Sequence, residues 1–241
     1  MKILVLGGSG ATGRRLILEL LSRGHEVTAV VRSSERFVGL TTPEWSERIH
    51  VVEASILELG RTEIENLVEQ CDGIGLCLGH NLTFKGLFGK PRHLVTDAVK
   101  RICDAAVTIK PEGQMKLVLM NTTANQNRGV EEHRKSAEKV LLRILRYVLP
   151  PHKDNEDAAE YLRSQIGPDH KSVGWVAVRP DTLTNEPRVS EYSVHSSPTR
   201  SPLFDPGKTS RANVAHFMAD LLEKNDHFVS WSGMMPVLYN V

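Results

Sequence analysis

The chain has few cysteines and no long apolar run, and both absences narrow the class of protein. Its three cysteines, Cys71, Cys77 and Cys103, are odd in number and lack the spacing of a metal site. They predict free thiols in a reducing compartment rather than a disulfide framework, so we expect a cytoplasmic protein. No window approaches about 18 apolar residues, so the sequence predicts no membrane span.

A dominant charge, a metal motif and a leader peptide are also missing. The net charge is +1, which gives no reason to expect nucleic acid as a partner. The histidines lack metal-ligand spacing, so we expect no metal. The N-terminal apolar run is too short for a signal peptide. A length of 241 residues suits one large α/β domain.

What the sequence does have is a glycine-rich turn directly after that apolar run. Residues 3–6 (ILVL) suit a strand buried on both faces of a parallel sheet, and residues 14–23 read as a helix with one apolar stripe. Glycines let the backbone approach a pyrophosphate, and a helix N-terminus presents free N–H groups to it. The candidate cofactor-binding residues of the turn are Gly7, Gly10, Ala11, Thr12 and Gly13. A turn without a ligand is the alternative.

The string GGSGATGRRL resembles the first turn of the atypical short-chain dehydrogenase/reductases, especially their NmrA-like and biliverdin-reductase-B-like members. The resemblance implies a doubly wound Rossmann fold, with a mainly parallel sheet of six to seven strands and helices on both faces. Apolar strands alternate with helices from end to end, so we expect a single NAD(P)-binding domain over residues 1–241. Its substrate side would be an irregular loop region at about 181–208, rich in proline.

The junction after the second expected strand, 26–31, predicts which nicotinamide cofactor binds. An NAD site usually has an acidic residue about 20 positions past the glycines, but Arg32 and Ser33 stand here. An arginine with a neighbouring serine suits a 2′-phosphate through charge-assisted hydrogen bonds. We therefore expect NADP as cofactor, with NADPH preferred over NADH. A solvated arginine is the alternative.

Three later strand ends carry further candidates. The third strand is followed by Ala54-Ser55, where the family often has Gly-Asp near the adenine, so Ser55 is the candidate there. The fourth strand ends at Gly79, which would let the dinucleotide pass close to the backbone. His80 and Asn81 would lie near the nicotinamide ribose, with His80 as a candidate catalytic residue. A loop histidine that is simply solvated is the alternative.

Two more candidates rest on the resemblance. Thr122 follows the fifth strand, 116–120, where the family carries a Ser or Thr that hydrogen-bonds the substrate carbonyl. A threonine that only caps a turn is the alternative. Pro180 lies in a segment, 179–184, that resembles the family's R-P-x-x-L segment, whose backbone meets the nicotinamide carboxamide.

The family's Tyr-x-x-x-Lys pair is missing. Residues 152–163 resemble its catalytic helix, but the lysine place falls on Asn155 and no tyrosine stands four residues before it. In the family the tyrosine transfers the proton and the lysine lowers its pKa. The sequence thus favours an NADPH-dependent reductase of a small conjugated acceptor, such as a flavin or quinone, that needs little enzymatic protonation. The alternative is a catalytically silent, NmrA-like NADP sensor that acts through a protein partner.

The sequence leaves the oligomeric state open between monomer and homodimer.

The apolar pattern also predicts the remaining helices and strands of the second half of the chain. Residues 131–147 predict a helix with Val140, Leu141, Ile144 and Leu145 inward, and a second helix begins at Asn155 or Asp157. A helix over 211–224 is N-capped by Thr209 or Ser210. Residues 228–231 predict a last short strand, followed by a tail at 235–239 that closes over the core.

Overall fold

The structure, a computed structural model, describes residues 1–35, 45–80, 89–109, 113–132 and 136–241. Its centre is an eight-stranded sheet with the order β3-β2-β1-β4-β5-β6-β10-β8. Neighbouring strands run parallel, except for the antiparallel pair β10 and β8. The first six strands in this order, β3-β2-β1-β4-β5-β6, have the arrangement of a doubly wound Rossmann sheet. The expected fold class is confirmed, with eight strands rather than six to seven.

The strands of the main sheet are short. They are β1 (Lys2–Leu6), β2 (Glu26–Val31), β3 (Ile49–Glu53), β4 (Gly73–Leu76), β5 (Met115–Met120), β6 (Val173–Pro180), β8 (Tyr192–His195) and β10 (Val237–Asn240). A separate two-stranded sheet pairs β7 (Thr182–Thr184) with β9 (Lys208–Ser210).

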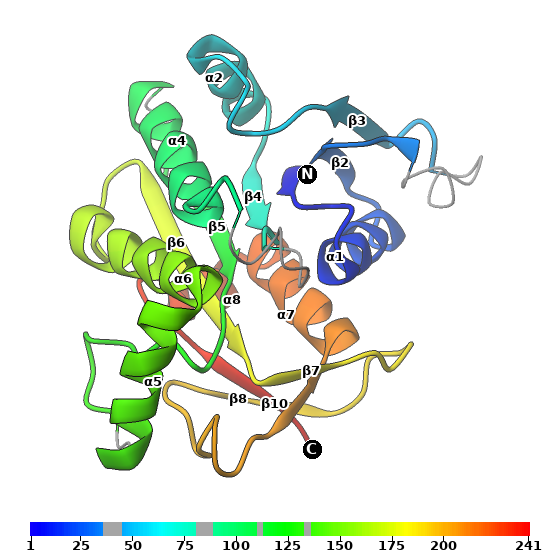
Figure 1. The fold of residues 1–241 in the computed structure, drawn as a ribbon. Coiled ribbons are helices and arrows are strands. Elements are labelled where there is room, and N and C mark those ends of the chain that lie inside the picture. The colour runs from blue at the N-terminus through cyan, green and yellow to red at the C-terminus, as the bar shows by residue number, and fades with distance from the viewer. Residues whose placement is uncertain (36–44, 81–88, 110–112, 133–135) are drawn as a thin grey trace.

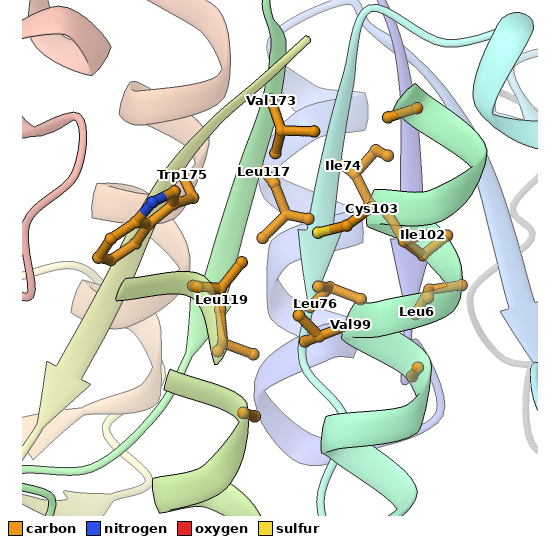
Figure 2. Close-up of a cluster of buried hydrophobic side chains, with 14 of the residues drawn as sticks. Leu6, Ile74, Leu76, Val99, Ile102, Cys103, Leu117, Leu119, Val173 and Trp175 are labelled. Carbon is orange, nitrogen blue, oxygen red and sulfur yellow. The ribbon is translucent and has the colours of Figure 1, made fainter. Parts of the chain in front are cut away.

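Helices cover both faces of the main sheet (Figure 1). One face carries α1 (Ala11–Ser22), α7 (Arg211–Glu223) and α8 (Asn225–Trp231), and the other carries α2 (Arg61–Glu69), α4 (Leu94–Ile109) and α6 (Pro150–Tyr161). Successive strand residues point to opposite faces, so Leu4 packs in one core and Val5 in the other. Figure 2 shows the α4 core, where Val99 and Ile102 face the strand residues Leu6 and Leu76.

The first βαβ unit forms as the sequence predicts. The helix α1 buries the expected stripe, whose members are all fully buried: Leu16, Ile17, Leu20 and Leu21. Gly24 ends the helix with φ +87, and its N–H donates to the Leu21 carbonyl. In the last third of the chain, the expected N-cap of α7 is also confirmed, because the Ser210 hydroxyl accepts the Asn213 N–H.

The inward face expected of the 131–147 helix is wrong. The helix α5 (Ser136–Val148) packs against α6 at the margin of the molecule (Figure 1). Val140, Leu141 and Ile144 are exposed rather than buried. Helical periodicity identifies an apolar stripe, but it does not say whether another element covers that stripe.

The next helix begins earlier than expected. Its first residue is Pro150 rather than Asn155 or Asp157, and Leu149 is its N-cap. Proline suits the first helical position because the N–H that it lacks would have no partner there. A π-helical turn, Leu162–Ile166, then extends α6.

The C-terminal expectations need three corrections. Residues 228–231 lie in the helix α8 rather than in a strand. The expected tail contains β10, an inner strand of the main sheet between β6 and β8. The region 181–208 is not wholly irregular, because β8 pairs with β10 and β7 pairs with β9. Within the described residues, none of the helices has the length and apolarity that a membrane span requires.

Candidate cofactor site

A cavity of about 500 Å³ opens at the carboxyl ends of the strands. We call it the switch-point cavity, because the strand order reverses between β1 and β4 beside it. Ligands of doubly wound sheets bind at this place. The expected residues that line it follow four different strands: Gly7, Gly10, Ala11, Thr12, Arg32, Ser55, Gly79 and His80.

The glycine turn packs tightly against the end of β4. Gly7 has φ +80, and a Cβ on it would lie 2.5 Å from the Cys77 carbonyl oxygen. A Cβ on Gly13 would lie 2.3 Å from the Gly7 carbonyl oxygen. The Gly10 N–H closes the turn by donating to that same oxygen at 3.0 Å. Side chains at Gly7 and Gly13 would therefore push the turn away from the sheet.

The N-terminus of α1 is open toward the cavity. The N-cap of the helix is Gly10, which has no side chain that could cap it, and the first turn holds no acidic residue. The first amides of a helix have no acceptor within the helix. Ala11 and Thr12 line the cavity, so these N–H groups and the helix dipole fit a pyrophosphate. The donor set and the glycine turn therefore fit a dinucleotide.

The corner after β2 holds both a cation and a nearby carboxylate. Arg32 is exposed and lines the cavity, whereas Ser33 does not. Glu53 ends β3 opposite Val31 and accepts the Ser34 N–H at 3.1 Å. Hydrogen bonding from Ser34 lowers the pKa of Glu53. Sequence reasoning missed this acid, because only the pairing of β2 with β3 brings it to the corner.

His80 is held by a buried carboxylate. Its Nε2 lies 2.7 Å from Oδ2 of Asp154, and its side chain is only 5% exposed. Asp154 is fully buried and also accepts the backbone N–H groups of Val95 and Thr96, the first turn of α4. Burial raises the pKa of Asp154, but hydrogen bonds from His80, Val95 and Thr96 outweigh it and bring the pKa below its usual range. His80 is thus not a solvated loop residue.

Several expected residues lie outside the cavity lining. Thr122 does not line it, and its hydroxyl accepts the Ala124 N–H at 3.3 Å, as a turn-capping threonine would. Pro180 is buried in β6, and its carbonyl accepts the Thr123 N–H. Gly13 packs beneath the turn instead of facing the cavity. Asn81 lies outside the described residues.

The cavity also contains residues that were not assigned from sequence. Leu183 and Arg211 reach it from the C-terminal third, and Met120 and Cys77 from β5 and the end of β4. Arg211 donates to Oδ1 of Asn185 at 2.9 Å. Burial raises the pKa of the Cys77 thiol to about 12, so this cysteine stays protonated and is no nucleophile. Leu183 lies in the 179–184 segment, and its resemblance to the family's R-P-x-x-L segment was the sequence signal that could have identified it.

Comparison with solved structures confirms the fold. A short-chain dehydrogenase/reductase from Veillonella parvula, in complex with NADP, matches with a TM-score of 0.68 and 16% identity over 99% of this chain and 94% of its own. The anaerobillin reductase ChuY from Escherichia coli matches with a TM-score of 0.68 and 13% identity, and the match covers 100% of this chain and 97% of ChuY. A candidate NADH-flavin reductase from Streptococcus pneumoniae matches with a TM-score of 0.66 and 17% identity over 100% of both chains.

Sequence comparison identifies the family. A search among curated proteins found no match. The family model described as NAD(P)H-binding matches residues 7–225, which run from the glycine turn to the start of α8. This match agrees with the cavity, whose glycine turn and open helix N-terminus fit a nicotinamide dinucleotide. The chain belongs to the NAD(P)H-binding family.

Proposed function

We propose that this chain is an NADPH-dependent reductase of a small conjugated acceptor such as a flavin or a quinone. The observation that carries the proposal is one cavity that combines the glycine turn, the open N-terminus of α1 and the exposed Arg32. Bound NADPH would supply a hydride there, while the protein orients the reactants and excludes water.

The candidate residues, inside and outside the cavity lining, divide along a dinucleotide. Gly7, Gly10, Ala11 and Thr12 would bind the pyrophosphate, above the close packing that Gly13 allows. Arg32 would bind the 2′-phosphate, with Ser33 beside it, and Ser55 would lie near the adenine. Gly79, Asn81 and Pro180 would hold the nicotinamide end, where Thr122 and His80 are the candidates for contact with the acceptor.

The chemistry of α6 supports a conjugated acceptor. Asn155 stands at the place of the family's lysine, and its side-chain N–H donates to the Pro151 carbonyl at 3.1 Å. The Tyr-x-x-x-Lys proton relay is therefore not rebuilt at this place. A flavin or quinone spreads the charge of an added hydride over a conjugated ring, so its reduction depends less on that relay. The same feature also suits the alternative function, an NADP sensor without turnover.

A turnover assay separates the two functions. NADPH oxidation would be followed by the absorbance of reduced nicotinamide, with FMN, simple quinones, biliverdin and small carbonyls as acceptors and NADH as the parallel control. We expect turnover with FMN or a quinone that is faster with NADPH. NADPH binding without turnover of any acceptor would contradict the reductase and favour the sensor. If NADP then slows the cleavage of the chain by a protease, this conformational response would support the sensor function.

A further inference from the structure

A buried carboxylate joins three elements behind the wall of the switch-point cavity. Asp154 of α6 is fully buried. Its Oδ2 accepts the Val95 N–H at 2.8 Å, and its Oδ1 accepts the Thr96 N–H at 3.0 Å and the Thr96 hydroxyl at 2.7 Å. Asp154 thus accepts two backbone N–H groups of the first turn of α4, and His80 adds a further bond from the cavity side.

The arrangement determines which nitrogen of His80 carries the proton. Because Asp154 is ionised and accepts every hydrogen bond that it makes, Nε2 of His80 must be the donor across the 2.7 Å contact. Nδ1 makes no hydrogen bond within the described part of the chain. The ring is therefore oriented through Nε2, which leaves Nδ1 as the ring nitrogen for contact with a ligand.

From this geometry we propose that His80 is the catalytic proton donor of the reductase and that Asp154 is its positioning residue. The proposal rests on the proposed function and adds the proton donor that the missing tyrosine and lysine leave unassigned. His80 lines the cavity and Thr122 does not, so the geometry selects His80 of the two candidates.

The proposed step balances with NADPH as the only reductant. The acceptor gains a hydride and is reduced, while the nicotinamide is oxidised. A heteroatom of the reduced acceptor takes a proton from Nδ1 of the His80 imidazolium, so the N–H bond breaks, its electron pair stays on the ring, and an O–H or N–H bond forms. The neutral ring regains a proton from water. Asp154 keeps the ring orientation through Nε2 during both transfers.

The first test measures the tautomer of His80 without any cofactor. Nitrogen NMR of the chain with isotope-labelled histidine should place the proton of the neutral His80 ring on Nε2. Asp154→Asn should reduce the preference of the proton for Nε2. The control is Asp97→Asn, which removes an exposed carboxylate from the first turn of α4 and should leave the tautomer of His80 unchanged. A proton on Nδ1, or an unchanged tautomer in Asp154→Asn, would overturn the proposal.

The second test separates kcat from binding. His80→Gln should lower kcat by about 10²-fold, the contribution of a general acid, with little change in the Kd for NADPH. Asp154→Asn should lower kcat less, and Asp97→Asn should not change it. Thermal unfolding checks that each variant is folded; His80→Gln keeps a side-chain N–H for Asp154.

The outcomes distinguish the two proposals. A wild-type chain that binds NADPH but reduces no acceptor contradicts the proposed function, and the proton transfer with it. If the wild type reduces an acceptor and His80→Gln reduces it at the same rate, only the role of His80 is contradicted. A loss of NADPH binding in His80→Gln, at unchanged kcat, would assign the residue to cofactor binding and also overturn its role as proton donor.

Discussion

The glycines at the switch-point cavity differ in what surrounds the place of a side chain. At Gly13 a Cβ would meet the Gly7 carbonyl oxygen at 2.3 Å, and this backbone atom cannot move without moving the turn. At Gly79 no atom of the described residues lies within 4 Å of a Cβ. Gly13 is therefore required by the fold, whereas a side chain at Gly79 would meet no described residue and would stand in the space that we assign to the cofactor.

Gly13→Ala should destabilise the protein. Overpacking of this kind costs about 1–3 kcal/mol of unfolding free energy, because α1 must move away from the glycine turn. Urea unfolding would measure it. Gly79→Ala, the matched control, should stay within about 0.5 kcal/mol of the wild type. Equal unfolding free energies of the two variants would show that the close packing at Gly13 does not contribute to the stability of the protein.

At the same residue scale, we expect Arg32 to determine the preference for NADPH over NADH. Arg32→Asp replaces a cation beside the proposed 2′-phosphate with an anion, next to Glu53. We expect the Kd for NADPH to rise at least about tenfold more than that for NADH, since only NADPH carries the 2′-phosphate. Fluorescence titration with both cofactors measures the ratio. Arg143→Asp, at an exposed residue of α5, is the charge-matched control, and equal losses for both cofactors would remove this role from Arg32.

At the scale of elements, Asp154 links α4 and α6 in a way that depends on pH. Its folded-state pKa lies below the ordinary value of about 3.9. A depressed pKa stabilises the fold above the unfolded-state pKa, and this contribution is lost as the pH falls through the folded-state pKa.

The difference in unfolding free energy between wild type and Asp154→Asn should therefore change with pH. We expect about 1–3 kcal/mol near neutrality, as for hydrogen bonds to a buried charge, and a shrinking difference below about pH 4. Urea unfolding at several pH values measures it. A difference that stays constant into acid would mean that the charge of Asp154 does not stabilise the link.

Local sequence signals predicted some elements well and others badly. The first helix and α7 follow from an apolar stripe and a cap, both of which are local. The expected strand at 228–231 is wrong because such a short apolar stretch also fits one turn of helix, and Phe228 is the buried residue of α8. The inner position of β10 depends on pairing with β6 and β8, which no local pattern encodes.

At the scale of the whole molecule, topology explains which part of the site was predictable. Gly7, Arg32, Ser55 and Gly79 each follow a strand, and a parallel sheet gathers such positions at one edge. Asp154 is 74 residues from His80 and lies on a different element, so only the packing of α6 on α4 brings the two together. The sequence therefore predicted which strand-end residues line the cavity, but it missed the partner of His80.

The most direct test of the account is calorimetric titration of the wild-type chain with NADPH, beside Gly79→Ala. We predict saturable binding at one site in the wild type. Binding by Gly79→Ala should be at least about tenfold weaker, a loss of about 1.4 kcal/mol, with unchanged unfolding free energy. No saturable binding in the wild type would contradict the central claim that the switch-point cavity holds NADP(H). Equal binding by Gly79→Ala would place the cofactor elsewhere.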